Sequence, residues 1–175
     1  MFPSTSIALS GSPGSGKSTI AELAKSSGWE VISVEKLAEK HGLLGLYDEK
    51  EQAKEIDIEK LRKSLGRING PLIIDGHLSH YLEVDAIVIL RCKPSILRER
   101  LLHRGYPEWK IESNVEWEII SSIIDEVKKD QKIYLYCRSG RRSKMATKLL
   151  KKKNFNVTNL EGGFIAWRKY FSTKQ

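Results

Sequence analysis

The strongest chemical motif in the sequence lies near its beginning, where residues 11–18 read GSPGSGKS. This is the spacing of a phosphate-binding loop, which follows a strand and opens a helix. Its glycines lack a Cβ, so the backbone can curl until successive N–H groups point at phosphate oxygens. Lys17 then bridges the β- and γ-phosphates of ATP, and Ser18 holds Mg²⁺. The alternative is a glycine- and serine-rich turn with no ligand. We expect ATP to be bound by Gly11, Gly14, Ser15, Gly16, Lys17, Ser18 and Thr19.

The apolar run PLIIDG at residues 71–76 supplies an acidic group for the same site. Asp75 closes this predicted strand, where its carboxylate can reach the metal or the metal's water shell, and His77 lies two residues further on. Taken alone, an aspartate after a strand is more often a turn or a helix cap. Its combination with a phosphate loop favours a site in which Ser18 and Asp75 are the metal ligands.

Basic residues are dense between positions 91 and 110, in RCKPSILRERLLHRGYPEWK. Phosphoryl transfer depends on positioned cations that offset the charge on the transferring group. Arg98, Arg100 and Arg104 are therefore candidates, and Arg104 lies at a helix end where a lid can hinge. The alternative for any one of them is a solvated helix face paired with Glu99.

Residues 134–143, YLYCRSGRRS, indicate a second anion-binding loop with a different chemistry. Cys137 ends a predicted strand, precedes a helix and has three arginines close behind it, all of which favour a thiolate. Such a thiolate can take up a sulfane sulfur. A phosphatase loop needs an arginine where Ser143 stands, whereas Arg142 closes a loop one residue shorter. The shorter loop suits sulfur better than phosphate.

Short apolar runs alternate with amphipathic stretches along the chain, as expected of a three-layer α/β fold with a parallel sheet. An amphipathic helix is predicted from about 108 to 129, and Pro94 and Gly105 fit the two ends of the helix before it. Trp109 and Trp117 are interpreted as core or helix-packing groups. The predicted strands are residues 6–10, 30–34, 71–76, 86–90, 132–137 and 156–161.

The composition restricts the class of protein. The 175 residues suit one domain or two very small ones. Lys and Arg number 30 against 22 Asp and Glu, and the resulting charge of +8 favours polyanionic partners such as nucleotides or RNA. Cys92 and Cys137 are too few for a disulfide framework, and Cys92 is interpreted as a small buried residue. No segment has the length of a membrane span or the pattern of a signal peptide, so we expect a cytoplasmic protein without membrane contact.

Residues 1–120 resemble the adenylate kinase isoenzyme-six family, the coilin-interacting nuclear ATPases and their archaeal relatives. The matching segments are GSPGSGKST, VISVEKLAEKHGL, YDEKEQAKEIDIEKL, IIDGHLSHYL, VILRCKPSILRERL and RGYPEWKIESNVEWEI. The resemblance implies transfer of phosphate from ATP to AMP and some ATPase activity. It also implies a role in maturation of the small ribosomal subunit, with ribosomal protein S11 and rRNA as partners.

The same resemblance assigns parts of the chain to substrates. It implies that residues 30–53 hold the nucleoside monophosphate and that residues 103–113 form a short lid. It further implies that Arg104 contacts ATP, and that Asp75 and His77 are the family's Walker B-like pair.

Residues 121–175 resemble the C-terminal half of a rhodanese domain. The matching letters run from IYLYCRSGRRSKMATKLL to NLEGGFIAW and cover about 132–170. The alternative to a sulfur site is a scaffold, in which strand 132–137 lies beside strand 86–90 in one parallel sheet. We therefore predict a P-loop NTPase-like sheet extended at its C-terminal edge by a rhodanese-like βαβα fragment, as a single-domain chimera.

Three functions are consistent with these motifs. The favoured one is a nucleoside monophosphate kinase that uses ATP, AMP and Mg²⁺, with Lys17, Asp75, His77 and Arg104 as catalytic residues. The second is a sulfurtransferase with a persulfide on Cys137. The third is a nucleotide-binding chimera or assembly factor that catalyses nothing.

Overall fold

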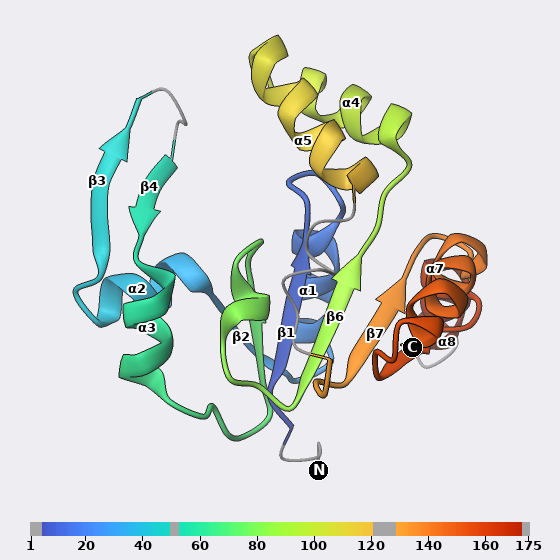
Figure 1. Cartoon of the computed structure of the whole chain (residues 1–175), viewed down its shortest axis with the longest axis horizontal. Coiled ribbons are helices and arrows are strands. Elements are labelled where there is room, and N and C mark those ends of the chain that lie inside the picture. The colour runs from blue at the N-terminus through green and yellow to red at the C-terminus, as the bar shows by residue number, and fades with distance from the viewer. Residues whose placement is uncertain (1–4, 50–52, 121–128, 173–175) are drawn as a thin grey trace.

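The chain folds around a six-stranded sheet (Figure 1). The computed structural model describes residues 5–49, 53–120 and 129–172. Every pairing in this sheet is parallel. In spatial order the strands are β2 (Glu30–Ser33), β5 (Leu72–Asp75), β1 (Ile7–Gly11), β6 (Ala86–Leu90), β7 (Ile133–Tyr136) and β8 (Val157–Asn159).

The six strands confirm the fold class predicted from the sequence, including the extension by the rhodanese-like part. Strand β7 pairs with β6 in register from Ile87 opposite Ile133 to Leu90 opposite Tyr136. Strand β8 continues the same sheet beside β7 and forms its edge. The phosphate-loop part and the rhodanese-like part therefore share one β-layer.

Helices cover both faces of the sheet because the side chains of each strand alternate between the faces. On one face, α1 (Lys17–Ser26) and the first turn of α8 (Gly163–Ser172) pack on residues such as Leu9 and Leu90. On the other face lie α2 (Val34–Lys40), α3 (Ile58–Leu65) and α7 (Arg141–Lys152), which pack on residues such as Ile87 and Leu135. Both apolar clusters extend from the kinase-like strands onto β7.

Helices α4 (Pro94–His103) and α5 (Glu108–Ile120) form a pair of their own beyond the carboxyl ends of the strands (Figure 1). Pro94 begins α4 and Gly105 follows its end with a φ of 72°, as predicted. Leu97 and Leu101 pack on Ile111 and Val115 between the two helices. The helix predicted over 108–129 is confirmed up to Ile120. Residues 121–128 lie outside the described residues, and Lys129 lies in a turn.

A two-stranded antiparallel hairpin, which the sequence analysis did not predict, stands apart from the sheet (Figure 1). It consists of β3 (Leu44–Asp48) and β4 (Ala53–Ile56) and lies between α2 and α3 in the sequence. A short 3-10 helix, η1 (Ser79–Tyr81), follows β5. Both elements matter for the site because they line the same cleft.

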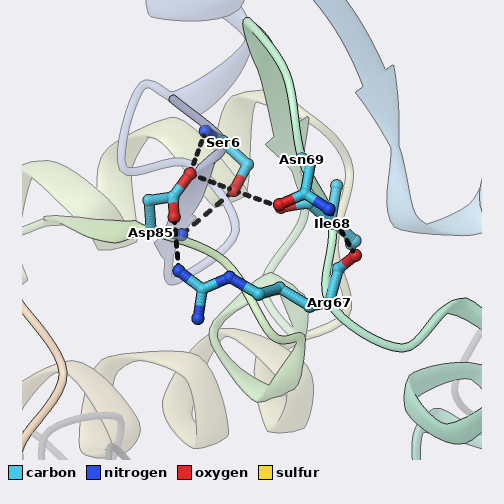
Figure 2. Close-up of polar contacts among 5 residues, drawn as sticks. All are labelled: Ser6, Arg67, Ile68, Asn69 and Asp85. Atoms are coloured by element: carbon cyan, nitrogen blue, oxygen red, sulfur yellow. Dashed lines mark hydrogen bonds and ion pairs between the residues drawn. The ribbon is translucent and has the colours of Figure 1, made fainter. Parts of the chain in front are cut away.

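A polar cluster holds the amino ends of β1 and β6 together (Figure 2). It lies at the opposite end of these strands from the phosphate loop. The main-chain N–H of Ser6 donates to Asp85 at 2.9 Å, and that of Asp85 donates to the Ser6 hydroxyl at 3.0 Å. The Ser6 hydroxyl lies 2.7 Å from the carbonyl oxygen of Ile68, and Arg67 donates to Asp85 at 2.7 Å. This cluster fixes β1 against β6 and against the segment that leads into β5.

None of the helices in the described ranges is long and apolar enough to cross a membrane.

Candidate functional site

The phosphate loop has the backbone that its glycines predict. Gly11, Gly14 and Gly16 have φ angles of 145°, 83° and 109°. A Cβ on Gly11 would lie 2.6 Å from the carbonyl oxygen of Leu90, so the loop passes too close to β6 for any side chain. A Cβ on Gly16, at the start of α1, would meet nothing within 4 Å. The space beside the first helical turn is open, and an anion there would face the amino end of α1.

Lys17 folds back over the loop. Its Nζ donates to the carbonyl oxygen of Gly11 at 2.7 Å and to that of Ser12 at 3.2 Å. Burial lowers the pKa of Lys17 to about 8, although Asp75 opposes the shift, and Arg104 lowers the pKa further. Both acceptors of the ammonium are neutral carbonyl oxygens. Charged phosphate oxygens would bind it more strongly.

Asp75 ends β5 and faces the same ammonium. Burial raises the pKa of its carboxyl group, and Lys17 opposes that shift. Its Oδ1 is buried and has no hydrogen-bond partner among the described residues. Ser18 and Thr19 lie exposed in the first turn of α1. A buried unpaired carboxylate oxygen and an exposed hydroxyl are oxygen ligands of the kind that Mg²⁺ prefers, so Asp75 and Ser18 would suit it.

His77 follows β5 and lines the cleft in front of the phosphate loop. Its main-chain carbonyl accepts a hydrogen bond of 3.0 Å from the Ser10 hydroxyl. The same hydroxyl lies 2.9 Å from Nδ1 of His80, which is buried. Strand β1 therefore positions the turn after β5 through a serine that precedes the phosphate loop.

The three candidate arginines take different positions. Arg100 donates to the carbonyl oxygen of Gly14 at 2.8 Å, so its guanidinium supports the phosphate loop directly. Arg104 lies exposed at the end of α4, close enough to Lys17 to lower the pKa of its ammonium. Arg98 instead pairs with Glu108 and Glu112 and ties α4 to α5. The geometry therefore favours Arg100 and Arg104 over Arg98 for contact with phosphate.

Glu118 is a residue of this site that the sequence analysis did not single out, although it lies in the matched segment NVEWE. Only 3% of the residue is exposed. It accepts a hydrogen bond from the Ser12 hydroxyl at 2.7 Å and one from Nε of Arg91 at 2.7 Å. The main-chain N–H of Cys92 donates to it at 2.9 Å. One buried carboxylate thus connects α5, the phosphate loop and the residues that follow β6.

A cleft of about 610 Å³ opens beside the phosphate loop. The loop forms one wall, and the β3–β4 hairpin, the turn with η1 and α5 form the others. Trp109 and Trp117, which we expected in the core or in helix packing, are 44% and 49% exposed and line this cleft. That expectation was wrong, because α5 packs on α4 through Ile111 and Val115 and leaves the two indoles on another face.

The second predicted loop follows β7. Cys137 is buried, and Gly140 directly precedes α7 with a φ of 77°. Burial opposes ionisation of the thiol, but the pKa of Cys137 is nevertheless lowered because four hydrogen bonds favour the thiolate. These bonds come from the hydroxyl of Ser143 and from the main-chain N–H groups of Ser139, Arg142 and Ser143.

The two loops lie at the carboxyl ends of strands in the same sheet. The phosphate loop follows β1, the Cys137 loop follows β7, and β6 lies between these strands. The main-chain N–H of Arg91, just after β6, donates to the carbonyl oxygen of Tyr136 at 3.2 Å. Cys92 is half-buried beside α4 and α5, and burial raises the pKa of its thiol. That environment agrees with a packing role for Cys92.

Two family profiles match the sequence. The family described as "AAA domain" matches residues 7–121, and the family described as "Rhodanese-like domain" matches residues 110–170. The two matches overlap along α5. A rhodanese-like C-terminal part is therefore confirmed, and its match begins further upstream than the 132–170 segment that the letters indicated.

Two archaeal proteins are similar to this chain, one of them over nearly its whole length. A protein of Archaeoglobus fulgidus named "Putative adenylate kinase" is 44% identical over 120 residues, which span 69% of this chain and 65% of that protein. A protein of the same name from Methanococcus maripaludis is 31% identical over 172 residues, which span 92% of this chain and 94% of that protein. The chain belongs to this archaeal adenylate-kinase-like family.

The fold of the adenylate-kinase-like chain is also found in a solved kinase. Shikimate kinase from Acinetobacter baumannii, in complex with shikimate, superimposes with a TM-score of 0.52 over 85% of this chain and 92% of its own. The two sequences are 16% identical, so the likeness shows the P-loop kinase fold alone.

Proposed function

We propose that the protein transfers the γ-phosphate of ATP to AMP. The observation that carries this proposal is the position of Lys17, a buried ammonium held over the phosphate loop by two carbonyl oxygens. Family membership supports a kinase, and the large cleft beside the loop supports a second substrate. A simple nucleotide switch needs no such cleft.

The chain's own residues supply positioning and charge. The N–H groups between Gly11 and Ser18 hold the phosphates of ATP, and Lys17 leaves its carbonyl partners to bind the β- and γ-phosphates. Arg104, at the end of α4, approaches the transferring phosphoryl group, while Arg100 keeps the loop in shape. Ser18 and Asp75 would hold Mg²⁺, which would neutralise phosphate charge when bound.

We infer that AMP occupies the cleft between the phosphate loop and the β3–β4 hairpin. The indoles of Trp109 and Trp117 give exposed aromatic faces on which a base can stack. His77, from the turn after β5, lies on the wall of the same cleft. It can orient the phosphate of AMP or a water molecule bound to that phosphate. This assignment extends the expected monophosphate region, residues 30–53, by the second strand of the hairpin.

A coupled assay of ADP formation tests the proposal. ATP with AMP should give turnover, and Lys17→Ala should abolish it while Lys63→Ala, on exposed α3, leaves it unchanged. Trp117→Ala should raise the KM for AMP about fivefold or more and leave the KM for ATP within about twofold, because a stacked base contributes about 1–3 kcal/mol. Equal effects on both substrates would refute the placement of AMP in this cleft.

The lowered pKa of Cys137 favours sulfur transfer as a second candidate function. The Cys137 thiolate would attack thiosulfate at its outer sulfur, form the persulfide and release sulfite. Cyanide would then take the outer sulfur as thiocyanate and return the thiolate, so that atoms and electrons balance. Main-chain N–H groups that favour a thiolate can equally hold the persulfide anion.

Thiocyanate formation from thiosulfate and cyanide tests the second function separately. Cys137→Ser should abolish it, and Cys92→Ser should leave it unchanged, because Cys92 has a raised pKa and packs between α4 and α5. Neither variant should alter ADP formation. No thiocyanate from the wild-type protein would refute sulfur transfer by the Cys137 loop.

We also propose finer assignments that rest on family resemblance. These are ATPase activity in the absence of AMP, a role in small-subunit ribosome maturation with ribosomal protein S11 and rRNA, and a cytoplasmic location. We place the boundary between the kinase-like and the rhodanese-like parts at about residue 120. Nucleotide-dependent capture of a purified S11-type protein tests the partner, with Lys17→Ala as the variant that should lose the nucleotide dependence.

A further inference from the structure

The excess positive charge of the protein is confined to its rhodanese-like part. Residues 1–128 contain 17 Lys and Arg against 20 Asp and Glu, a net charge of −3. Residues 129–175 contain 13 Lys and Arg against 2 Asp and Glu, a net charge of +11. Such asymmetry between two parts of one chain indicates a partner with many negative charges.

These cations gather on one exposed surface, which we call the α7 cationic face. It consists of the Cys137 loop and the outer side of α7, while the inner side of that helix packs on the sheet through Thr147 and Leu150. No acidic residue occurs between positions 131 and 160. The exposed cations of this face are Arg138, Arg141, Arg142, Lys144, Lys148, Lys151, Lys152 and Lys153.

The charge of this face is not neutralised within the described part of the protein. Among the described residues, no cation of this face forms an ion pair, whereas cations between residues 60 and 98 pair with carboxylates. Exposed lysines of the kinase-like part, such as Lys60, lie beside carboxylates such as Asp57. The described residues therefore leave the charge of the α7 cationic face available to an external anion.

The spacing of the cations fits a linear polyanion. Arg141, Lys144, Lys148 and Lys151 recur at helical intervals along one side of α7 and span about 15 Å at 1.5 Å per residue. Phosphates along one nucleic-acid strand follow each other about every 3.4 Å, so the row covers about four nucleotides. A mononucleotide would reach only one or two of these cations.

Two apolar side chains distinguish a single strand from a duplex. Met145 and Leu149 lie among the cations and are 71% and 63% exposed. A duplex hides the faces of its bases, whereas a single strand exposes base faces that apolar side chains can cover. A membrane surface is a poorer fit, because Leu150 packs on the sheet, and Met145 and Leu149 alone offer lipid only a small apolar area.

We propose that the α7 cationic face binds a single strand of nucleic acid through its phosphodiester backbone. This function is separate from phosphotransfer and does not depend on it. Binding is measured as the fluorescence anisotropy of a labelled oligonucleotide of about a dozen nucleotides, about three lengths of the row. Saturating Mg·ATP in every sample removes any binding of the oligonucleotide to the phosphate loop.

The salt dependence of binding tests the number of contacts. Four phosphate contacts by a single strand predict a slope of about −3 for log K against log salt concentration. The double variant Lys148→Gln with Lys151→Gln should reduce the slope to about −1.5. The double variant Lys60→Gln with Lys63→Gln removes the same charge from exposed α3 and should leave the slope unchanged. Thermal unfolding of both variants controls for their folding.

Three results would overturn the proposal. The first is an equal loss of binding in the two double variants, which would show that only net charge matters. The second is tighter binding of a blunt duplex of the same sequence than of the single strand. The third is binding to vesicles of anionic lipid with no binding to the oligonucleotide. RNA and DNA oligomers of equal length are compared in parallel, and binding to either one supports the proposal.

Discussion

Replacing Glu118 by glutamine is the sharpest single perturbation of the phosphate loop. The carboxylate is 2% exposed in its side chain and receives hydrogen bonds from Ser12, Arg91 and the N–H of Cys92. The substituted amide keeps the shape and one of the two oxygens but loses the charge. A hydrogen bond to a charged group contributes about 1.5–3 kcal/mol and one to a neutral group about 0.5–1.5 kcal/mol.

The loss should therefore be about 2 kcal/mol in the free energy of unfolding, summed over the weakened bonds. It should stay below the roughly 3–5 kcal/mol typical of a broken buried pair, because the Arg91 side chain is 20% exposed and can recruit water. Glu118→Ala removes both carboxylate oxygens and should cost about 4 kcal/mol. The matched control is Glu116→Gln, an exposed carboxylate on the same helix, which should change stability by less than about 0.5 kcal/mol.

Urea denaturation gives the free energies of unfolding, and calorimetric titration with Mg·ATP gives the effect on the loop. Glu118→Gln should weaken ATP binding as well as stability, since Ser12 loses a charged acceptor and Lys17 loses a nearby negative charge. Equal stability of Glu118→Gln and Glu116→Gln would refute the argument. A stability loss with unchanged ATP affinity would show that Glu118 supports the fold but not the loop.

Three further predictions concern other parts of the chain. The pKa of Lys17 is lowered to about 8 from an ordinary 10.5, so the free energy of unfolding should rise with pH between these values. ATP binding above pH 8 should also take up a proton, and calorimetry in buffers of different ionisation enthalpy measures this uptake. Gly163→Ala places a Cβ 1.9 Å from the carbonyl oxygen of Cys137 and should cost more than about 3 kcal/mol in thermal or urea unfolding, whereas Gly42→Ala, with a similar φ of 65° but open space, should cost about 1–2 kcal/mol. Asp85→Asn should lower stability at pH 7 by about 1–2 kcal/mol, and the difference should vanish in acid, because hydrogen bonds from Ser6 and Arg67 lower the pKa of Asp85 and its contribution is lost as the group protonates.

The sequence sufficed for the parts of the fold that depend on local signals. The phosphate loop needs particular residues at fixed spacing, and each buried strand of a parallel sheet is a continuous apolar run. The pairing of β7 with β6 was also predictable, since a right-handed crossover places the next parallel strand at the open edge.

The hairpin of β3 and β4 could not be predicted from the same signals. Its residues are largely exposed, with Leu46 at 87% and Tyr47 at 57%, so no alternation of buried and exposed residues marks the strands. The two strands pair only with each other and form no part of the central sheet. Their sequence is also rich in charge, which is typical of loops.

The roles of Glu118 and of the cleft tryptophans depend on tertiary structure. A glutamate on a charged helix looks solvent-exposed, and only the approach of the phosphate loop and Arg91 buries it. Trp109 and Trp117 look like core residues by type. Their exposure follows from the side of α5 that packs on α4, which the sequence pattern alone did not settle.

Phosphorus NMR of a reaction containing protein, Mg·ATP and AMP tests the central claim most directly, because it follows each phosphate separately. Transfer within one site between the phosphate loop and the hairpin cleft predicts two ADP formed for each AMP consumed, with no matching release of inorganic phosphate, and no reaction with Lys17→Ala. ADP and inorganic phosphate rising together while AMP stays constant would contradict a phosphotransferase and leave a nucleotide hydrolase on the same sheet.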